Sequence, residues 1–189
     1  MSARVLPVFL RLDGRAVLVV GGGPVAAVKI EALLEAGAAV TVVAPEIRPE
    51  IARPGVRLER RPFAPADLEG VWYVVAAAPP EVNRQVQDAA ERRQVFVNAV
   101  DDPSHATAYM GAVVRRAGVT IAVSTAGAAP ALAGLLREGL DACLPADLDT
   151  WMRTAGAARD AWRRDGVPIA RRRPMLLEAL NRLYEERAH

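Results

Sequence analysis

The sequence predicts an α/β protein with a Rossmann-like parallel sheet domain, then a small β-hairpin and helix segment for dimerisation, then a C-terminal helical domain. Three observations predict this fold. An apolar strand runs directly into a glycine turn and a helix near the N-terminus. Apolar strands then alternate with amphipathic helices up to residue 100. Beyond that the pattern changes to a hairpin and helices, which predicts domain limits of 1–111, 112–145 and 146–189.

Residues 17–26, VLVVGGGPVA, are typical of the phosphate-holding corner of a dinucleotide-binding fold. Gly21 supplies a tight turn, Gly23 lets the backbone approach a pyrophosphate, and Ala26 allows close packing of helix on strand. Free N–H groups and the helix dipole then favour a bound phosphate. The alternative is a strand–turn–helix corner without a ligand. The residues expected to contact the cofactor here are Gly21, Gly22, Gly23, Pro24 and Val25.

The helix after this turn is predicted to end at Gly37, before a second strand at residues 40–43. Spacings of three and four place several apolar residues on one face, which we expect to be its packing face. These residues are Val25, Val28, Ala32 and Ala36.

Three further strands and one helix complete the predicted sheet domain. The strands are expected at residues 56–59, 70–77 and 95–100, and the helix at residues 81–93. Val82, Val86 and either Ala89 or Ala90 would face inward. Units of this length form a parallel sheet with helices on both faces and right-handed crossovers.

The pattern of the remaining chain predicts a hairpin followed by helices. Residues 112–115 and 119–123 flank the turn of the hairpin, and a helix follows over residues 131–144. The rest is predicted to be helical with a break at residues 166–168. A hairpin and helix this small bury little surface alone, so we expect them to pack against a second subunit.

Composition excludes several classes of protein. The 189 residues are 52% hydrophobic, but no apolar run approaches the ~20 residues of a membrane span, and no secretory signal begins the sequence. The single cysteine, Cys143, excludes an internal disulfide framework and a cysteine-built zinc site, so a cytoplasmic protein without a metal site of its own is expected. The 24 basic residues nearly balance 22 acidic ones. An arginine-rich C-terminal third is either a solvated helix face or a polyanion site, and no nucleic-acid-binding motif accompanies it.

The ends of the parallel strands supply the other candidate site residues, because ligands bind at that edge of such sheets. Ala44 and Pro45 follow the second strand, where an acidic residue usually holds the adenine ribose. Glu46 could serve from a shifted position, while Arg48 raises the alternative of NADP. The loop after Ala77 lies at the same edge. Asn83 beyond it would contact the nucleotide or simply sit in the first helical turn.

Two loops combine polar and small residues. Residues 101–105, DDPSH, follow the last strand of the sheet, where a carboxylate can accept a proton, although the sequence is also typical of an ordinary turn. His105 could bind a metal transiently or be a plain loop residue. Residues 124–130, STAGAAP, precede a helix and form either an anion site or a capped helix start.

Taken in order, these motifs resemble the precorrin-2 dehydrogenase family, the N-terminal module of siroheme synthases. The resemblance covers nearly the whole chain and rests on the order of individually modest motifs. These are PVF at residues 7–9, VGGGPVA at 20–26 with Lys29, LLEAGA at 33–38, VVAPE at 42–46, NAVDDP at 98–103, STAG at 124–127 and RRR at 171–173.

The resemblance implies NAD-dependent oxidation of precorrin-2 to sirohydrochlorin in siroheme synthesis, by an intertwined homodimer, with Fe²⁺ or Co²⁺ insertion in some members. It places the family's proton-accepting aspartate on Asp101 and its phosphorylatable serine on Thr125. An arginine-rich cap would bind the substrate's carboxylates. The residues expected to contact this tetrapyrrole are Asp102, His105, Ser124, Thr125, Gly127, Arg171 and Arg172.

Two other functions remain open from the sequence. The chain departs from the family pattern at Ala78-Pro79, where a threonine and an aspartate are common, and this removes a possible cofactor contact. A non-redox tetrapyrrole chelatase would tolerate that loss. A nucleotide-sensing module without catalytic activity is the third alternative, but such a module has no evident need for carboxylates at a strand end.

Overall fold

The computed structural model describes residues 5–100, 102 and 106–185. Its contacts divide the chain into two compact units. The first unit runs to Met110 and includes Ser124–Ala129, and the second consists of Gly111–Val123 and the chain from Pro130 onward. The functional limits of 1–111, 112–145 and 146–189 stay a prediction.

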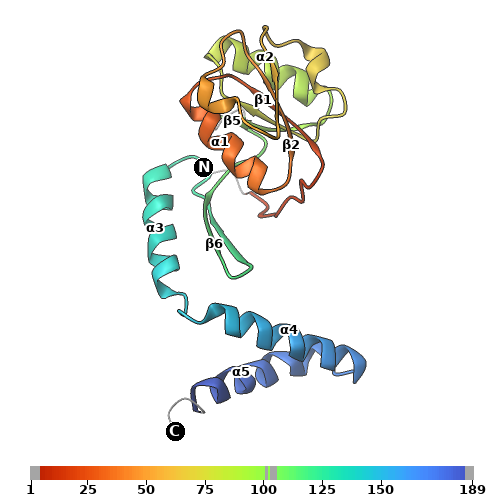
Figure 1. The fold of residues 1–189 in the computed structure, drawn as a ribbon, viewed down its shortest axis with the longest axis vertical. Helices are drawn as coiled ribbons and strands as arrows, with labels where there is room; N and C mark the ends of the chain where they lie inside the picture. The colour runs from red at the N-terminus through yellow and green to blue at the C-terminus, as the bar shows by residue number, and fades with distance from the viewer. Residues whose placement is uncertain (1–4, 101, 103–105, 186–189) are drawn as a thin grey trace. The chain divides into compact units, whose positions relative to one another are not determined.

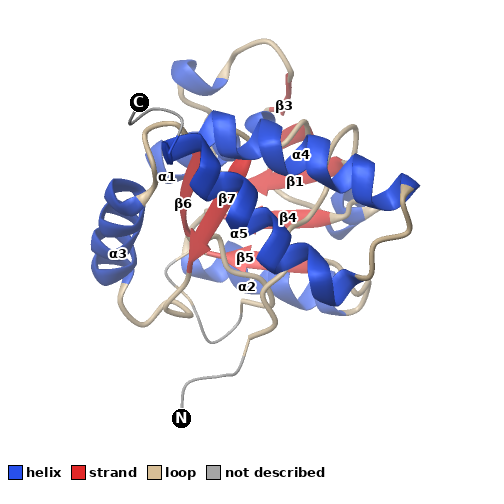
Figure 2. Cartoon of the chain, turned by 90° about the horizontal axis from the view of Figure 1, so that it is seen from below, coloured by secondary structure: helices blue, strands red, loops and turns tan. Residues whose placement is uncertain are grey.

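The first unit contains a five-stranded sheet in the order β3-β2-β1-β4-β5, in which each neighbouring pair is parallel (Figures 1 and 2). This is the predicted Rossmann-like arrangement, in which the strand order reverses at β1. The strands are β1 (Ala16–Val20), β2 (Ala39–Val43), β3 (Val56–Glu59), β4 (Tyr73–Ala76) and β5 (Phe96–Ala99).

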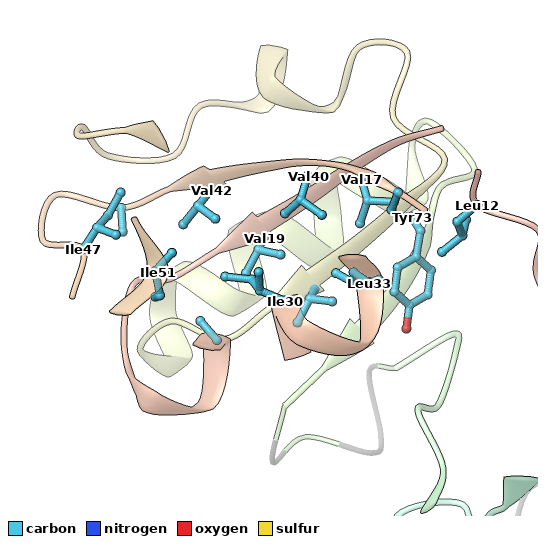
Figure 3. Packing of buried hydrophobic residues seen from close by; sticks show 14 residues of the cluster. Leu12, Val17, Val19, Ile30, Leu33, Val40, Val42, Ile47, Ile51 and Tyr73 are labelled. Carbon is cyan, nitrogen blue, oxygen red and sulfur yellow. The ribbon is translucent and has the colours of Figure 1, made fainter. Parts of the chain in front are cut away.

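Helix α1 (Pro24–Glu35) covers one face of the sheet, but not with the face that the sequence spacing predicted. Of the four predicted residues, Val25 and Val28 are exposed and Ala32 and Ala36 are half-buried, whereas Ala26, Ile30 and Leu33 are buried. Figure 3 shows the last two lying against valines of β1 and β2. The correction has a physical reason: both faces of this helix are apolar, so spacing alone could not select the one turned toward the sheet.

A second apolar cluster lies on the opposite face of the sheet, beneath helix α2 (Pro80–Glu91) and the short 3₁₀ helix η2 (Pro65–Leu68). Val86 is buried there as predicted, both alternatives Ala89 and Ala90 are buried, and Val82 is half-buried against the cluster. A further 3₁₀ turn, η1 (Pro49–Ile51), connects β2 to β3. Burial raises the pKa of the Tyr73 phenol at the start of β4, so this group stays neutral.

The second unit consists of an antiparallel hairpin and three helices, as the sequence predicts. The hairpin pairs β6 (Ala112–Arg116) with β7 (Val119–Val123). Figure 1 shows α4 and α5 side by side, separated by the predicted break. The helices are α3 (Pro130–Cys143), α4 (Leu148–Arg164) and α5 (Ile169–Glu185). Within the described residues, no helix is long and apolar enough to cross a membrane.

Candidate nucleotide-binding site

The site lies where the strand order reverses. β1 and β4 are neighbours, and their chain continuations lead to helices on opposite faces, which is the arrangement at whose strand ends dinucleotides bind in open α/β sheets. The glycine turn follows β1, and the loop Ala77–Pro79 follows β4. These two segments therefore form the walls of the candidate site.

Gly21 is required by the contact between these two walls. Its φ is +121°, and a Cβ atom at this position would lie 2.2 Å from the Ala77 carbonyl oxygen. Its N–H donates to the Val43 carbonyl at 3.0 Å, which ties the turn to β2 as well. The predicted tight turn is confirmed, and Ala77 is the residue that the missing side chain accommodates.

Gly22 is constrained by the loop after β2, which the sequence did not indicate. A Cβ atom on Gly22 would lie 2.1 Å from the Glu46 carbonyl oxygen. The Gly22 carbonyl accepts the Arg48 N–H at 3.0 Å. The turn and the β2 loop thus pack backbone to backbone, and a side chain at Gly22 would separate them.

Gly23 differs from the other two glycines because nothing lies within 4 Å of the position its Cβ atom would take. It is the N-cap of α1, and no side chain caps the helix or places an acid in its first turn. The first helical hydrogen bond runs from the Ala27 N–H to the Gly23 carbonyl at 3.1 Å, so the N–H groups of Val25 and Ala26 precede it. This open, uncapped helix start has the features that suit a phosphate.

The loop after β2 carries the two residues that the sequence links to adenosine recognition, Glu46 for NAD and Arg48 for NADP. Ala44 is buried, and its N–H donates to the Glu59 carbonyl at 3.2 Å, while Pro45 is exposed. Glu46 is exposed, and the Arg48 guanidinium pairs with Glu50. The ribose contacts predicted for Ala44 and Pro45 stay a prediction.

Asn83 holds the loop after β4 in place. Its side chain is buried, and its Oδ1 accepts the Ala78 N–H at 3.0 Å. The Asn83 N–H donates to the Pro79 carbonyl at 3.0 Å. The asparagine therefore shapes the wall that includes Ala77, and a direct contact with the nucleotide stays a prediction.

Asp101 and His105, two of the predicted site residues after β5, lie outside the described residues. Asp102 is half-buried. The chain enters this segment at Val100, whose N–H donates to the Ala76 carbonyl at 3.0 Å. Val100 itself therefore lies beside β4 at the carboxyl edge of the sheet.

In the loop before α3, the structure shows hydroxyl groups that accept backbone N–H groups. The Ser124 Oγ accepts the Ala126 N–H, and the Thr125 Oγ1 accepts the Ala129 N–H, each at 3.1 Å. Gly127 has φ of +79°. These bonds match the alternative of a capped helix entry, and substrate contacts at Ser124, Thr125 and Gly127 stay a prediction.

The arginines proposed for substrate carboxylates lie on α5 in the second unit. Arg171 is exposed, and the half-buried Arg172 donates from Nε to the Val167 carbonyl at 3.0 Å. Their contact with a substrate stays a prediction. Among the described residues, no group of three or more His, Cys, Asp or Glu side chains is arranged to hold a metal ion.

Comparisons with known proteins agree with this geometry. Residues 8–112 match the model of a family described as putative NAD(P)-binding. The chain is 44% identical to siroheme synthase 3 of Aeromonas hydrophila over 160 residues, 82% of this chain and 34% of that protein. It is 40% identical to siroheme synthase of Photorhabdus laumondii over 181 residues, 93% of this chain and 38% of that protein. It thus spans about a third of the length of these curated relatives.

A solved structure matches over nearly the whole chain. SirC, a precorrin-2 dehydrogenase, superposes with a TM-score of 0.73 at 32% sequence identity. The match covers 92% of this chain and 88% of that one. The similarity therefore includes the hairpin and the helices as well as the sheet.

Proposed function

This chain belongs to the precorrin-2 dehydrogenase family of NAD(P)-binding proteins, and from that premise we propose that it oxidises precorrin-2 to sirohydrochlorin with NAD. The observation that carries the proposal is the uncapped start of α1 behind the glycine turn. It supplies unpaired backbone donors at the point of the sheet where dinucleotides bind. The route served would be siroheme synthesis, in the cytoplasm, a reducing compartment that suits the exposed free thiol of Cys143.

The residues on the walls fit a dinucleotide. Backbone groups of Gly21, Gly22, Gly23 and Val25 would hold the pyrophosphate, with Pro24 fixing the first helical turn. The adenosine half would lie toward β2, and the nicotinamide half toward the loop that Asn83 holds. The cofactor-binding set we propose beyond the turn is Ala44, Pro45, Ala77 and Asn83.

NAD, when bound, supplies the hydride acceptor. The substrate loses a hydride from a ring carbon and a proton from the macrocycle, so a base is needed beside the nicotinamide end of the site. We assign that proton to Asp101, which follows β5 in sequence and carries a carboxylate that can accept a proton. The protein's contribution is then position and a proton acceptor.

Substrate recognition would use charge. Precorrin-2 is a polycarboxylate, and arginine pairs with carboxylates through two parallel hydrogen bonds. We propose Arg171 and Arg172 for this task. Further substrate contacts are assigned to Asp102, His105, Ser124, Thr125 and Gly127.

We also propose that the protein is a homodimer that joins through the second unit. Among the described residues of that unit, only Val114, Ala133 and Leu148 are buried apolar residues. Helix α3 leaves a row of leucines exposed, by 41% to 66% of their surface: Leu132, Leu135, Leu136 and Leu140. A second copy would cover this row, and light scattering of wild type and Leu135→Glu would test it. A dimeric wild type and a monomeric, folded variant are expected, whereas a monomeric wild type contradicts the proposal.

The activity is tested by anaerobic turnover of precorrin-2 with NAD or NADP and no added metal. NADH absorbance should grow together with the sirohydrochlorin spectrum, and Asp101→Asn should lower kcat by about a hundredfold or more. Asp165→Asn, a carboxylate change just after α4, is the matched control and should leave kcat unchanged. No turnover with either nucleotide would reject the dehydrogenase. Sirohydrochlorin with Fe²⁺ or Co²⁺ would then separate a chelatase from a nucleotide-sensing module.

A further inference from the structure

The loop after β2, residues 44–48, is fixed against the glycine turn by backbone contacts. Gly22 has no room for a Cβ atom, which would lie 2.1 Å from the Glu46 carbonyl oxygen and 2.7 Å from the Ile47 Cα. The Arg48 N–H donates to the Gly22 carbonyl at 3.0 Å. Ile47 is buried in the apolar cluster of β1, β2 and α1, which anchors the loop to the sheet domain (Figure 3). The backbone of Glu46 therefore has a fixed place beside the turn proposed for the pyrophosphate.

The position at the end of β2 that usually carries a ribose-binding acid has no acid in this chain. Counting about 20 residues from the glycines reaches Ala44, which has no polar side chain and is buried. Its N–H is already bonded to the Glu59 carbonyl at 3.2 Å. Glu46 is the next acidic residue along the chain, and its side chain is exposed. A carboxylate that binds the ribose from this loop must therefore come from beyond the usual position.

The two arginines that contact this loop are both engaged with protein groups. The Arg48 guanidinium pairs with the Glu50 carboxylate. Arg60, just after β3, donates from Nη1 to the Ile47 carbonyl at 3.3 Å. The Glu46 carboxylate, by contrast, has no hydrogen bond or ion pair in the part of the chain that the structure describes. The unpaired charge that this loop offers to a ligand is thus negative.

A negative charge beside the adenine ribose distinguishes the two dinucleotides. In NAD the ribose carries a 2′-hydroxyl, and a carboxylate accepts hydrogen bonds from the 2′- and 3′-hydroxyls. In NADP a phosphate replaces the 2′-hydroxyl, and a carboxylate repels it. We propose that Glu46 selects NAD over NADP, by accepting the ribose hydroxyls and repelling a 2′-phosphate. This inference rests on the proposed function, since it assumes that a dinucleotide lies on the glycine turn.

The test is calorimetric titration of the full chain with ADP-ribose and with its 2′-phosphate, two probes that lack the reacting nicotinamide ring. Wild type should bind ADP-ribose at least about tenfold more tightly than the 2′-phosphate. Glu46→Ala should weaken ADP-ribose binding about tenfold, because a hydrogen bond to a charged group is lost, and should not weaken binding of the 2′-phosphate. Equal affinities of wild type for the two probes, or an unchanged ADP-ribose affinity in Glu46→Ala, overturn the proposal.

Glu50→Ala is the matched control, because it removes the same charge from the chain just after the same loop. It should leave the affinity for ADP-ribose within about twofold, while the released Arg48 should strengthen binding of the 2′-phosphate. Both glutamates are exposed, so the melting temperatures without ligand should match that of wild type. Equal losses of ADP-ribose affinity in the two variants would assign the selection to the general charge of this region and reject a contact with Glu46.

Turnover of precorrin-2 separates this proposal from the proposed function. If ADP-ribose binds selectively through Glu46 but the wild type oxidises no precorrin-2, the dehydrogenase assignment fails and the selection stands. If precorrin-2 is oxidised with the same kcat/KM for NAD and for NADP, the dehydrogenase assignment stands and selection by Glu46 is rejected.

Discussion

The two units of this chain bury their apolar side chains to very different degrees. In the first unit, a parallel sheet is covered on both faces, and residues such as Val19, Ile30, Val74 and Val86 have no exposed surface. In the second unit, α5 has no buried residue, and α3 and α4 have one each among the described residues. The first unit therefore has its own core, while the second leaves most of its described apolar side chains partly or fully exposed.

The difference follows from the kind of element in each unit. Parallel strands are apolar along their whole length because both faces are covered, so a short strand such as AVLVV is enough to form a core. A two-stranded hairpin with a helix beside it has too few layers to enclose side chains, and α4 and α5 bury only Leu148 between them among the described residues. The first unit therefore has a packed core of its own, whereas the second unit leaves apolar surface uncovered, as the proposed dimer would require.

The largest effect is expected from a cavity in the first unit. Ile30 is fully buried between α1 and the sheet, so Ile30→Ala should lower the free energy of unfolding by about 3 kcal/mol. Leu135→Ala in α3, where the side chain is 66% exposed, should change it by less than about 0.5 kcal/mol in the monomer. Urea unfolding at low protein concentration measures both. Equal losses would show that the second unit has a core of its own and would break the comparison.

The glycine turn offers a sharper test, because one of its glycines is needed for the fold and another only for the proposed ligand. Gly21→Ala puts a Cβ atom against the Ala77 carbonyl at a φ of +121°, and should cost about 2 kcal/mol of stability as well as NAD binding. Gly23→Ala meets nothing in the protein and has a φ of −89°, so the fold should be unchanged. Its methyl group would still meet the phosphates, and NAD affinity should fall at least about tenfold. Calorimetric titration with NAD and thermal unfolding distinguish the two; unaltered NAD affinity in Gly23→Ala would place the phosphates elsewhere.

The geometry of the glycine turn was predictable because glycine, strand and helix signals are local. Gly21 forms the tight turn and Ala26 is buried against the sheet, as their spacing predicted. The Gly22 contact with Glu46 joins residues more than twenty positions apart, and no local pattern encodes it. The packing face of α1 was wrong for a related reason, since an apolar helix surface does not reveal which side meets the sheet.

Two residues that sequence reasoning missed, Asn98 and Thr107, form hydrogen bonds between β5 and the chain beside it. Asn98 was noted only as part of a motif, and Thr107 was not noted at all. An asparagine inside an apolar strand is a detectable signal, because that residue type is depleted in strands. A threonine in a loop carries no such signal, and its role appears only when the edge of β5 is seen to need an acceptor.

A polar clamp in the first unit, formed by Arg61 and Asp67, should make a smaller, pH-dependent contribution to the free energy of unfolding. Arg61 donates to both oxygens of Asp67, at 2.9 and 2.6 Å, and the Ala64 N–H donates to one of them at 2.8 Å. These bonds hold the pKa of the Asp67 carboxyl below its usual value. The clamp therefore stabilises the fold above the unfolded-state pKa, near 4, and this stability is lost as pH falls through the lower folded-state pKa.

Asp67→Asn should accordingly lower the free energy of unfolding by about 1 kcal/mol at pH 7 and by much less at pH 3. The exposed pair of Asp149 and Arg153 on α4 is the matched control in the second unit, because the pKa of Asp149 is also lowered by its arginine. Asp149→Asn should change stability little at either pH, since both groups are solvated. Urea unfolding at the two pH values is the measurement. A pH-independent loss in Asp67→Asn would assign the effect to packing.

The smallest effect on stability is expected from removing the hydroxyl of Tyr184, which links α5 to Trp151 of α4 and to Asp147 just before it. The Trp151 Nε1 donates to the Tyr184 hydroxyl at 2.8 Å, and that hydroxyl donates to Asp147 Oδ1 at 3.1 Å. The two rings meet edge to face at 6.3 Å, a contact that Tyr184→Phe would keep. Because Tyr184 is 42% exposed, water can replace the lost bonds, and the variant should lose less than about 1 kcal/mol in thermal unfolding. If Tyr184→Phe lowered the free energy of unfolding as much as Ile30→Ala does, these hydrogen bonds would be a main source of stability for α4 and α5.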